Sequence, residues 1–104
     1  MNPRLPDSAL AAAAECLKTL GHPARLRLLE RLADGPCTVG VLAEDCGLPQ
    51  PAVSAHLRLL ERCGFFTGTR QGKFVSYAIA RPQVSALLEL IRLHFDPKPK
   101  RKKP

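Results

Sequence analysis

The chain has 104 residues, 45% of them apolar, and a formal net charge of +7. This length gives one small globular domain, and no apolar run approaches the roughly 18 residues of a transmembrane helix, so we expect no membrane span. The start MNPRLPDSALAAAA has two prolines and no leucine-rich stretch, which is not typical of a secretory signal, so we expect a cytoplasmic protein with reduced thiols.

Positive charge is concentrated in one internal segment and one tail. Residues 47–81 carry five basic side chains against one acidic, and residues 96–104 again carry five against one. This pattern suits a polyanionic partner, either nucleic acid or an anionic membrane surface, although a plain solvated surface is the alternative. The membrane is the weaker partner, because the tail has neither interleaved aromatic residues nor an amphipathic helix beside it.

Two helices are expected in the first third of the chain, after a flexible arm at residues 1–7. Ser8 is a suitable N-cap for a helix that ends near Leu20, where Gly21 stops it. Pro23 suits the first turn of the next helix, because its missing N–H costs nothing there. The apolar stripe of the first helix consists of Leu10, Ala13, Ala14, Leu17 and Leu20. The side chains that we expect to face inward from the second helix are Leu26, Leu29, Leu32 and Ala33.

The next two helices form a helix-turn-helix pattern. Thr38 is expected to cap a short helix that ends near Cys46, and a fourth helix follows at residues 50–62. Gly47-Leu48-Pro49 forms the turn between them, and two helices joined by a three-residue turn that contains glycine are typical of a helix-turn-helix. The predicted buried seam of the fourth helix consists of Val53, Leu57 and Leu60.

After Gly64 the hydrophobic period changes from that of a helix to that of a strand. FFTGTR and FVSYAIA are short β-rich runs around Gln71-Gly72-Lys73, which predicts a β-hairpin with Gly72 at its turn. Pro82 then begins a last helix that runs to about Phe95.

Together these elements describe a winged helix-turn-helix, mainly α with a β-hairpin wing, in the order α-α-α-α-β-β-α. We expect residues 8–95 to form this single domain, for DNA binding and dimerisation, and residues 96–104 to form a disordered basic tail. The tail either follows DNA phosphates without sequence preference or serves as a solubilising end.

The outer face of the 50–62 helix carries small, hydroxyl-bearing and cationic side chains. Small residues at its leading end let a helix approach base edges in the major groove, and arginines further along meet phosphates or a guanine edge. Two further cations flank the hairpin turn, where a wing lies over a neighbouring groove. The DNA contacts predicted from this pattern are Gln50, Ser54, Ala55, Arg58, Arg62, Arg70 and Lys73.

Three segments carry a resemblance to a known family: LGHPARLRLL, LPQPAVSAHLRLLERCGF and RQGKFVSYAI. Over roughly residues 15–95 the chain resembles the ArsR/SmtB family of bacterial winged-helix repressors. The resemblance implies a homodimer that binds palindromic operator DNA and loses affinity when a small inducer acts. It places His56 in or beside the recognition segment, where packing, hydrogen bonding and DNA contact are all open. It also implies a dimer interface on the first and last helices, at Leu10, Leu17, Leu87 and Ile91.

The sensing sites of this family are altered here. The matching positions hold Thr38 and Gly40 for a thiolate site, Arg81, Gln83 and His94 for a zinc site, and Glu30 and Asp96 for a persulfide-sensing cysteine pair. None of these sets supplies the ligands that its site needs, and an arginine would repel Zn²⁺. The resemblance therefore implies no metal site of the family's usual form, and we expect no cofactor.

Two of the four cysteines form a candidate thiol sensor. Cys37 lies directly before the third helix, where the helix dipole would lower its thiol pKa, although packing on Leu42 as a hydrophobic staple is the alternative. With Cys16 it could hold a thiolate-bound metal or metalloid. Cys46 is expected to be a small buried apolar side chain, and Cys63 a structural side chain at the edge of the core.

An enzyme is not expected. Catalysis needs a nucleophile, a base or paired carboxylates in mutual reach, and the chain has no Ser/His/Asp arrangement and no Gly-rich phosphate loop. The stronger alternative is a winged-helix module that binds protein and lacks specific DNA affinity. That module would show little salt-sensitive DNA binding, whereas a DNA-binding regulator depends strongly on salt.

Overall fold

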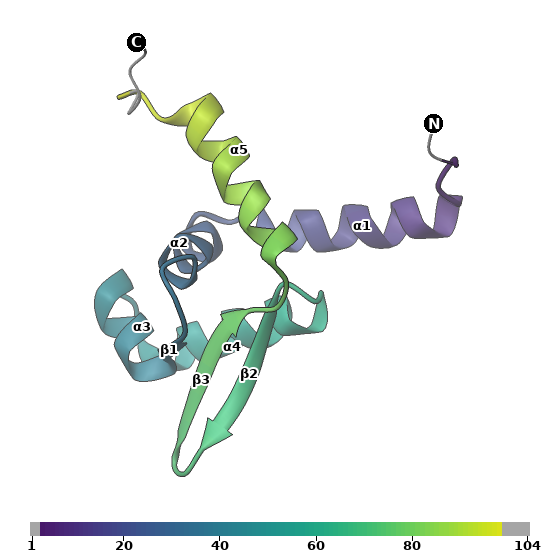
Figure 1. Ribbon diagram of the computed structural model, residues 1–104. Helices are drawn as coiled ribbons and strands as arrows, with labels where there is room; N and C mark the ends of the chain where they lie inside the picture. The colour runs from purple at the N-terminus through teal and green to yellow at the C-terminus, as the bar shows by residue number, and fades with distance from the viewer. Residues whose placement is uncertain (1–2, 99–104) are drawn as a thin grey trace.

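The computed structural model describes residues 3–98. Its elements, in chain order, are α1 Asp7–Leu20, α2 Pro23–Leu32, β1 Cys37–Thr38, α3 Val39–Cys46, α4 Gln50–Arg62, β2 Phe66–Gln71, β3 Phe74–Ile79, the 3-10 turn η1 Pro82–Val84 and α5 Ser85–Phe95 (Figure 1). The predicted order of four helices, a hairpin and a helix is confirmed. Residues 1–2 of the predicted arm and 99–104 of the predicted tail lie outside the described residues. Every helix within residues 3–98 is too short or too polar to cross a membrane.

Local capping explains where α2 and α3 begin. The His22 Nδ1 atom accepts a hydrogen bond from the Ala24 N–H at 3.1 Å, and a proline occupies the first turn of α2, as predicted. Thr38 Oγ1 accepts a hydrogen bond from the Val41 N–H at 3.4 Å and caps α3, again as predicted. Gly47, with a φ of +67°, ends α3 in the left-handed conformation that glycine adopts without strain.

The first helix begins earlier than predicted. Asp7 is its first residue, and Pro6 rather than Ser8 is its N-cap. The Pro6 carbonyl accepts hydrogen bonds from the N–H groups of Ala9 and Leu10. The fixed φ of the proline therefore sets the helix start, and Asp7 in the first turn interacts favourably with the helix dipole. The prediction of a Ser8 cap is wrong for this reason.

The wing is a three-stranded sheet rather than a plain hairpin. β2 and β3 pair in antiparallel fashion over their full length around Gly72, whose φ of +63° fits the predicted turn. β1 pairs with the other edge of β3, with Cys37 opposite Tyr77, so the strand order is β1-β3-β2. β1 was not predicted, because two residues are too few to show the alternation of a strand. Its pairing connects the start of α3 to the wing.

The core lies between the helices and the sheet. Its largest fully buried side chains are Phe66, Leu28, Leu29, Leu42, Leu57, Leu60 and Val53. The predicted seam of α4 is thus confirmed. In α2, Leu28 is buried and the predicted Ala33 is exposed. Leu28 is buried because α2 contacts α3, β3 and α5, which together cover more than one side of the helix. Ala33 is exposed because it follows the last residue of α2.

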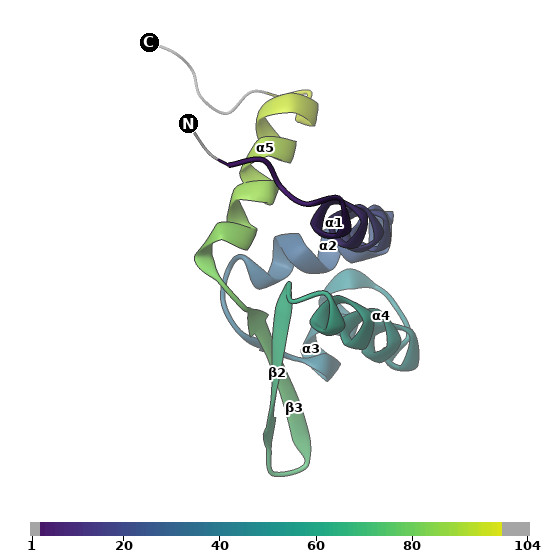
Figure 2. The ribbon, with the colours of Figure 1, turned by 90° about the vertical axis from the view of Figure 1, so that its right-hand side faces the viewer.

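The first and last helices extend away from this core. The β2–β3 hairpin projects on the side opposite α5, and both views place α1 and α5 away from the tip of the hairpin (Figures 1 and 2). All residues of α1 are described, and only Leu20 among them is buried. The rest of the apolar stripe of α1 lies outside the core, and its Leu10 and Leu17 are exposed, as a residue of an interface with a second chain would be in one protomer.

Candidate nucleic-acid interface

α4 buries one face and presents a polar face to solvent. Val53, Leu57 and Leu60 are fully buried, and they fix the rotation of the helix about its axis. On its other sides the structure places exposed Gln50, Ala55, Arg58 and Arg62, and half-buried Ser54. Unpaired backbone N–H groups at the N-terminal end of α4 suit a phosphate.

The tip of the wing lies beside the leading end of α4. An open cavity of about 140 Å³ is lined by Thr38, Val39, Gly40, Gln50, Ser54, Lys73, Phe74 and Val75. Lys73 therefore shares one concave surface with Gln50 and Ser54, and Arg70 is exposed on the adjoining strand β2. Arg62 does not join this group, because it lies about 18 Å further along α4.

Glu61 connects α4 to the wing. One of its carboxylate oxygens accepts a hydrogen bond from the Tyr77 hydroxyl at 3.3 Å, and the other accepts one from the Gly68 N–H at 3.1 Å. A Cβ atom at Gly68 would lie 2.9 Å from two ring carbons of Tyr77, so only glycine fits there without movement of the ring. Burial, together with the charge of Glu61, raises the pKa of Tyr77 and keeps its hydroxyl a donor.

His56 faces α2 rather than the outer face of α4. Its Nδ1 atom accepts a hydrogen bond from Arg25 Nε at 2.9 Å, and its ring lies 5.2 Å from the ring of His22. Arg25 also donates to the Thr19 carbonyl at 2.7 Å. Burial, followed by the positive charge of Arg25, lowers the pKa of His56. Of the roles left open by the sequence, hydrogen bonding is the one that this geometry supports.

Phe74 was not among the predicted contacts, although it lines the cavity at the wing tip. Its side chain is 62% exposed, next to Lys73. The alternation of FVSYAIA carries the signal, because Phe74 falls on the strand face opposite to buried Tyr77. A large apolar side chain on the outward face of a hairpin tip is a feature that strand periodicity alone could have identified.

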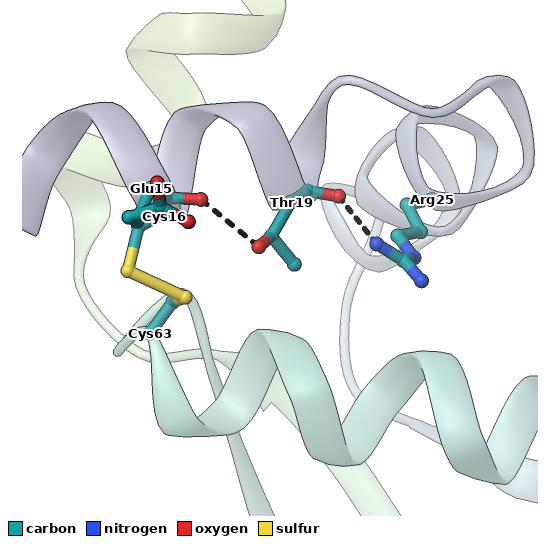
Figure 3. The surroundings of a disulfide bond; sticks show 5 residues. All are labelled: Glu15, Cys16, Thr19, Arg25 and Cys63. Atoms are coloured by element: carbon teal, nitrogen blue, oxygen red, sulfur yellow. Dashed lines mark hydrogen bonds between the residues drawn. A yellow bond between two sulfur atoms is a disulfide. The ribbon is translucent and has the colours of Figure 1, made fainter.

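The cysteines are arranged differently from the prediction. Cys16 is disulfide-bonded to Cys63, with a Cα–Cα distance of 5.6 Å, so Cys16 is not paired with Cys37 and the four thiols are not all reduced (Figure 3). Cys63 is half-buried, at the edge of the core as expected, but it is not a free thiol. Burial raises the pKa of Cys37, so the lowered pKa expected before a helix start is not found. Burial also raises the pKa of Cys46.

Comparison with known proteins identifies this architecture. A family model described as a helix-turn-helix domain matches residues 20–66. The transcriptional regulator NmtR of Mycobacterium tuberculosis is 39% identical over 92 residues, which are 88% of this chain and 77% of NmtR. The transcriptional repressor SmtB of the same species is 37% identical over 75 residues, 72% of this chain and 56% of SmtB. The chain belongs to the ArsR/SmtB family of winged-helix transcriptional regulators.

A solved structure agrees with this assignment to the ArsR/SmtB family. The homodimeric winged helix-turn-helix DNA-binding domain of Mb0332 from Mycobacterium bovis is 30% identical, with a TM-score of 0.78. The match covers 92% of this chain and 91% of that domain. The similarity therefore extends over the helices, the wing and α5, and the fold is that of a DNA-binding transcriptional regulator.

The metal positions of the ArsR/SmtB family do not fit a metal in this chain. Thr38 uses its hydroxyl to cap α3, and Gly40 has no side chain. Arg81 precedes η1 and supplies a cation instead of a carboxylate. Among residues 3–98 there is no group of three or more His, Cys, Asp or Glu side chains arranged to hold a metal ion. We therefore assign no metal to these positions.

Proposed function

We propose that the chain acts as a homodimeric repressor that binds operator DNA through α4 and the β2–β3 wing. The main support is the exposed cationic and hydroxyl-bearing face of α4, which lies beside the wing tip and is backed by a fully buried seam. Each protomer would place α4 in a major groove, and the two half-sites would lie roughly 34 Å apart, one turn of the DNA. A dimer bound there would block polymerase.

The interface divides into a base-reading end and phosphate contacts. Short side chains at the leading end of α4 allow close approach to base edges, whereas long cationic side chains reach the backbone. We assign base contacts to Gln50, Ser54 and Ala55, and phosphate contacts to Arg58, Arg62, Arg70 and Lys73. We leave His56 out of this set, because its Nδ1 is bound to Arg25.

The dimer interface would lie on α1 and α5. These helices expose large apolar side chains between 51% and 73%, namely Leu10, Leu17, Leu90, Leu93 and Phe95. Leu87 and Ile91, which the sequence favoured, are half-buried against the body of the protomer and would lie at the edge of the interface. The homodimeric Mb0332 domain supports a second copy of the chain as the partner of this face.

The repressor would work in the cytoplasm and leave its operator in response to a small inducer or a change in its thiols. Relatives named as transcriptional regulators support a location in the cytoplasm. As the signal for release, a metal or metalloid held by Cys16 together with Cys37 is not favoured, because Cys16 is bonded to Cys63.

The proposal is tested by selecting 30-base-pair duplexes from a randomised library with the full chain. Fluorescence anisotropy then compares wild type, Arg58→Ala and, as a matched exposed arginine outside the interface, Arg4→Ala. We expect Arg58→Ala to raise the dissociation constant about tenfold or more and Arg4→Ala to change it less than about twofold. Failure to enrich any sequence, or equal effects of the two variants, would favour the protein-binding alternative.

A further inference from the structure

The Cys16–Cys63 bond joins two elements that have different tasks in the proposed function. Cys16 lies in α1, and Cys63 directly follows the last residue of α4 (Figure 3). The two residues are 47 positions apart, so the bond closes a covalent loop that contains α2, α3 and the whole of α4. The helix proposed to form the dimer is thereby linked covalently to the helix proposed to read DNA.

Little else holds α1 to the body of the protomer. Leu20 at its C-terminal end is its one buried side chain within the described residues. Beyond it, the Thr19 carbonyl accepts a hydrogen bond from Arg25, and the Thr19 hydroxyl donates only to Glu15 in the same helix (Figure 3). Without the disulfide, α1 is therefore free to turn about its end at Gly21, because few buried apolar contacts oppose local movement.

In the protomer, both cysteines line a surface groove that is open to solvent. An apolar groove with a volume of about 420 Å³ is lined by Ala12, Ala13, Cys16, Leu17, Cys63 and Phe65. Hydrogen peroxide is small and uncharged, so it can enter such a groove. The other two cysteines are poorer targets: Cys37 is buried, and burial raises the pKa of both Cys37 and Cys46, which lowers their thiolate fraction.

We propose that Cys16 and Cys63 form a reversible oxidation site for peroxide, and that their disulfide strengthens operator binding by fixing α1 against the recognition helix. The effect on the operator rests on the proposed function. In a dimer built through α1, freedom between α1 and α4 becomes freedom in the distance between the two recognition helices. Operator half-sites have one spacing, so the linked form loses less conformational entropy on binding.

The oxidation step is balanced by peroxide as the oxidant. One thiolate attacks a peroxide oxygen and breaks the O–O bond, which gives a sulfenic acid and, after protonation of the departing hydroxide, one water. The second thiolate attacks the sulfenic sulfur, forms the S–S bond and expels hydroxide, which takes up a proton as the second water. Two thiols thus lose two electrons to one peroxide. A dithiol reductant reverses the step by thiol–disulfide exchange.

The experiment uses the full chain, reduced with dithiothreitol or oxidised with one equivalent of hydrogen peroxide per protomer. Peptide mapping by mass spectrometry identifies the bond formed. Anisotropy on the library-selected duplex gives the dissociation constant, and thermal unfolding gives a readout that needs no DNA. The variants are the Cys16→Ser/Cys63→Ser double variant and Cys46→Ser, which removes another half-buried thiol as the matched control.

Oxidised wild type and Cys46→Ser should bind the duplex about three- to tenfold more tightly than the reduced forms. They should also unfold roughly 10 °C higher, because the loop closed is long. The double variant should show neither difference. A bond between other cysteines, or equal dissociation constants in the two redox states, overturns the proposal. A reversible Cys16–Cys63 bond with a higher unfolding temperature, but no DNA binding in either state, retains the oxidation site and overturns the proposed function.

Discussion

At the scale of single residues, α4 is held by side chains that face the protomer and not the surface proposed to bind DNA. His56 accepts a hydrogen bond from Arg25, which in turn donates to the end of α1, so three helices meet at one guanidinium. The acceptor atom must be unprotonated for this contact to form. The protonation state of one histidine therefore affects how α4 is held.

This contact predicts a pH dependence of stability. Unfolded, His56 titrates near 6.5, whereas burial and Arg25 lower its pKa in the folded chain. The contribution of neutral His56 is therefore fully present above about pH 6.5 and is lost as the pH falls through the lower, folded pKa. We therefore expect the urea concentration at the unfolding midpoint of wild type to decrease as the pH is lowered from about 7 to about 5.

The matched variants isolate this titration. His56→Gln retains an acceptor for Arg25 but does not titrate, so its urea midpoint should change less over the same pH range. His94→Gln replaces an exposed histidine of α5 and should retain the wild-type dependence. Identical pH profiles for wild type and His56→Gln would show that His56 does not supply the effect.

At the scale of elements, Glu61 makes α4 and the wing one rigid unit. Its two carboxylate oxygens contact the β2 backbone and the β3 side chain Tyr77, and Gly68 leaves the space for that ring. The angle between the recognition helix and the wing is therefore set by a close approach of backbone and aromatic ring.

Gly68→Ala tests this arrangement. The added methyl group must displace Tyr77, so we expect a loss of about 1–3 kcal/mol in the free energy of unfolding, measured with urea. Gly40→Ala is the control, because its Cβ would meet only the Gln50 side chain at 3.8 Å, and alanine favours a helix. Gly68→Ala as stable as wild type would contradict the close packing described for the wing.

The elements were predictable where one local signal sets them. A proline in the first turn, the Thr38 cap, and Gly47 and Gly72 at their turns were visible in the sequence, and all four hold in the structure. The two-residue strand β1 was not predictable, because its existence depends on a partner far along the chain, with Tyr77 of β3 opposite Cys37. Local sequence specifies caps and turns, whereas short strands depend on tertiary contact.

In the candidate site, too, some positions follow from local sequence and others depend on tertiary packing. The outward position of Arg58 and its neighbours follows from helical periodicity once the seam of α4 is known. The orientation of His56 depends on where α2 packs, and the Cys16–Cys63 pair depends on where α1 crosses the end of α4. α5 has apolar residues on several faces, so periodicity could not decide between Leu87 and Leu90 as the exposed side chain.

At the scale of the whole molecule, a single protomer leaves apolar surface uncovered on the side away from the wing. Leu93 is 66% exposed and Phe95 is 73% exposed on α5. Exposed large apolar side chains of this kind are typical of an interface. The β2–β3 hairpin projects on the side opposite α5, so dimerisation through α1 and α5 would leave the wing of each protomer free.

Leu93→Glu should therefore prevent dimerisation. A charge buried at a symmetric interface appears twice, once from each protomer, and we expect it to reduce the free energy of dimerisation by about 2 kcal/mol or more. Light scattering after gel filtration should then give the mass of a monomer. Phe74→Glu places the same charge at another highly exposed apolar residue, on the wing, and should stay dimeric. A dimeric Leu93→Glu with native circular dichroism would move the interface away from α5.

The central claim is that the two copies of the α4 and wing surface together read DNA. The most direct test is an anisotropy titration of wild type on the library-selected duplex and on a scrambled duplex, repeated across salt concentrations. Arg58, Arg62, Arg70 and Lys73 from two protomers would neutralise up to eight phosphates, which predicts a slope of log affinity against log salt of about −7. We also predict at least roughly 10³-fold tighter binding of the selected duplex. Equal, weak affinities for both duplexes, with a slope near zero, would contradict the account.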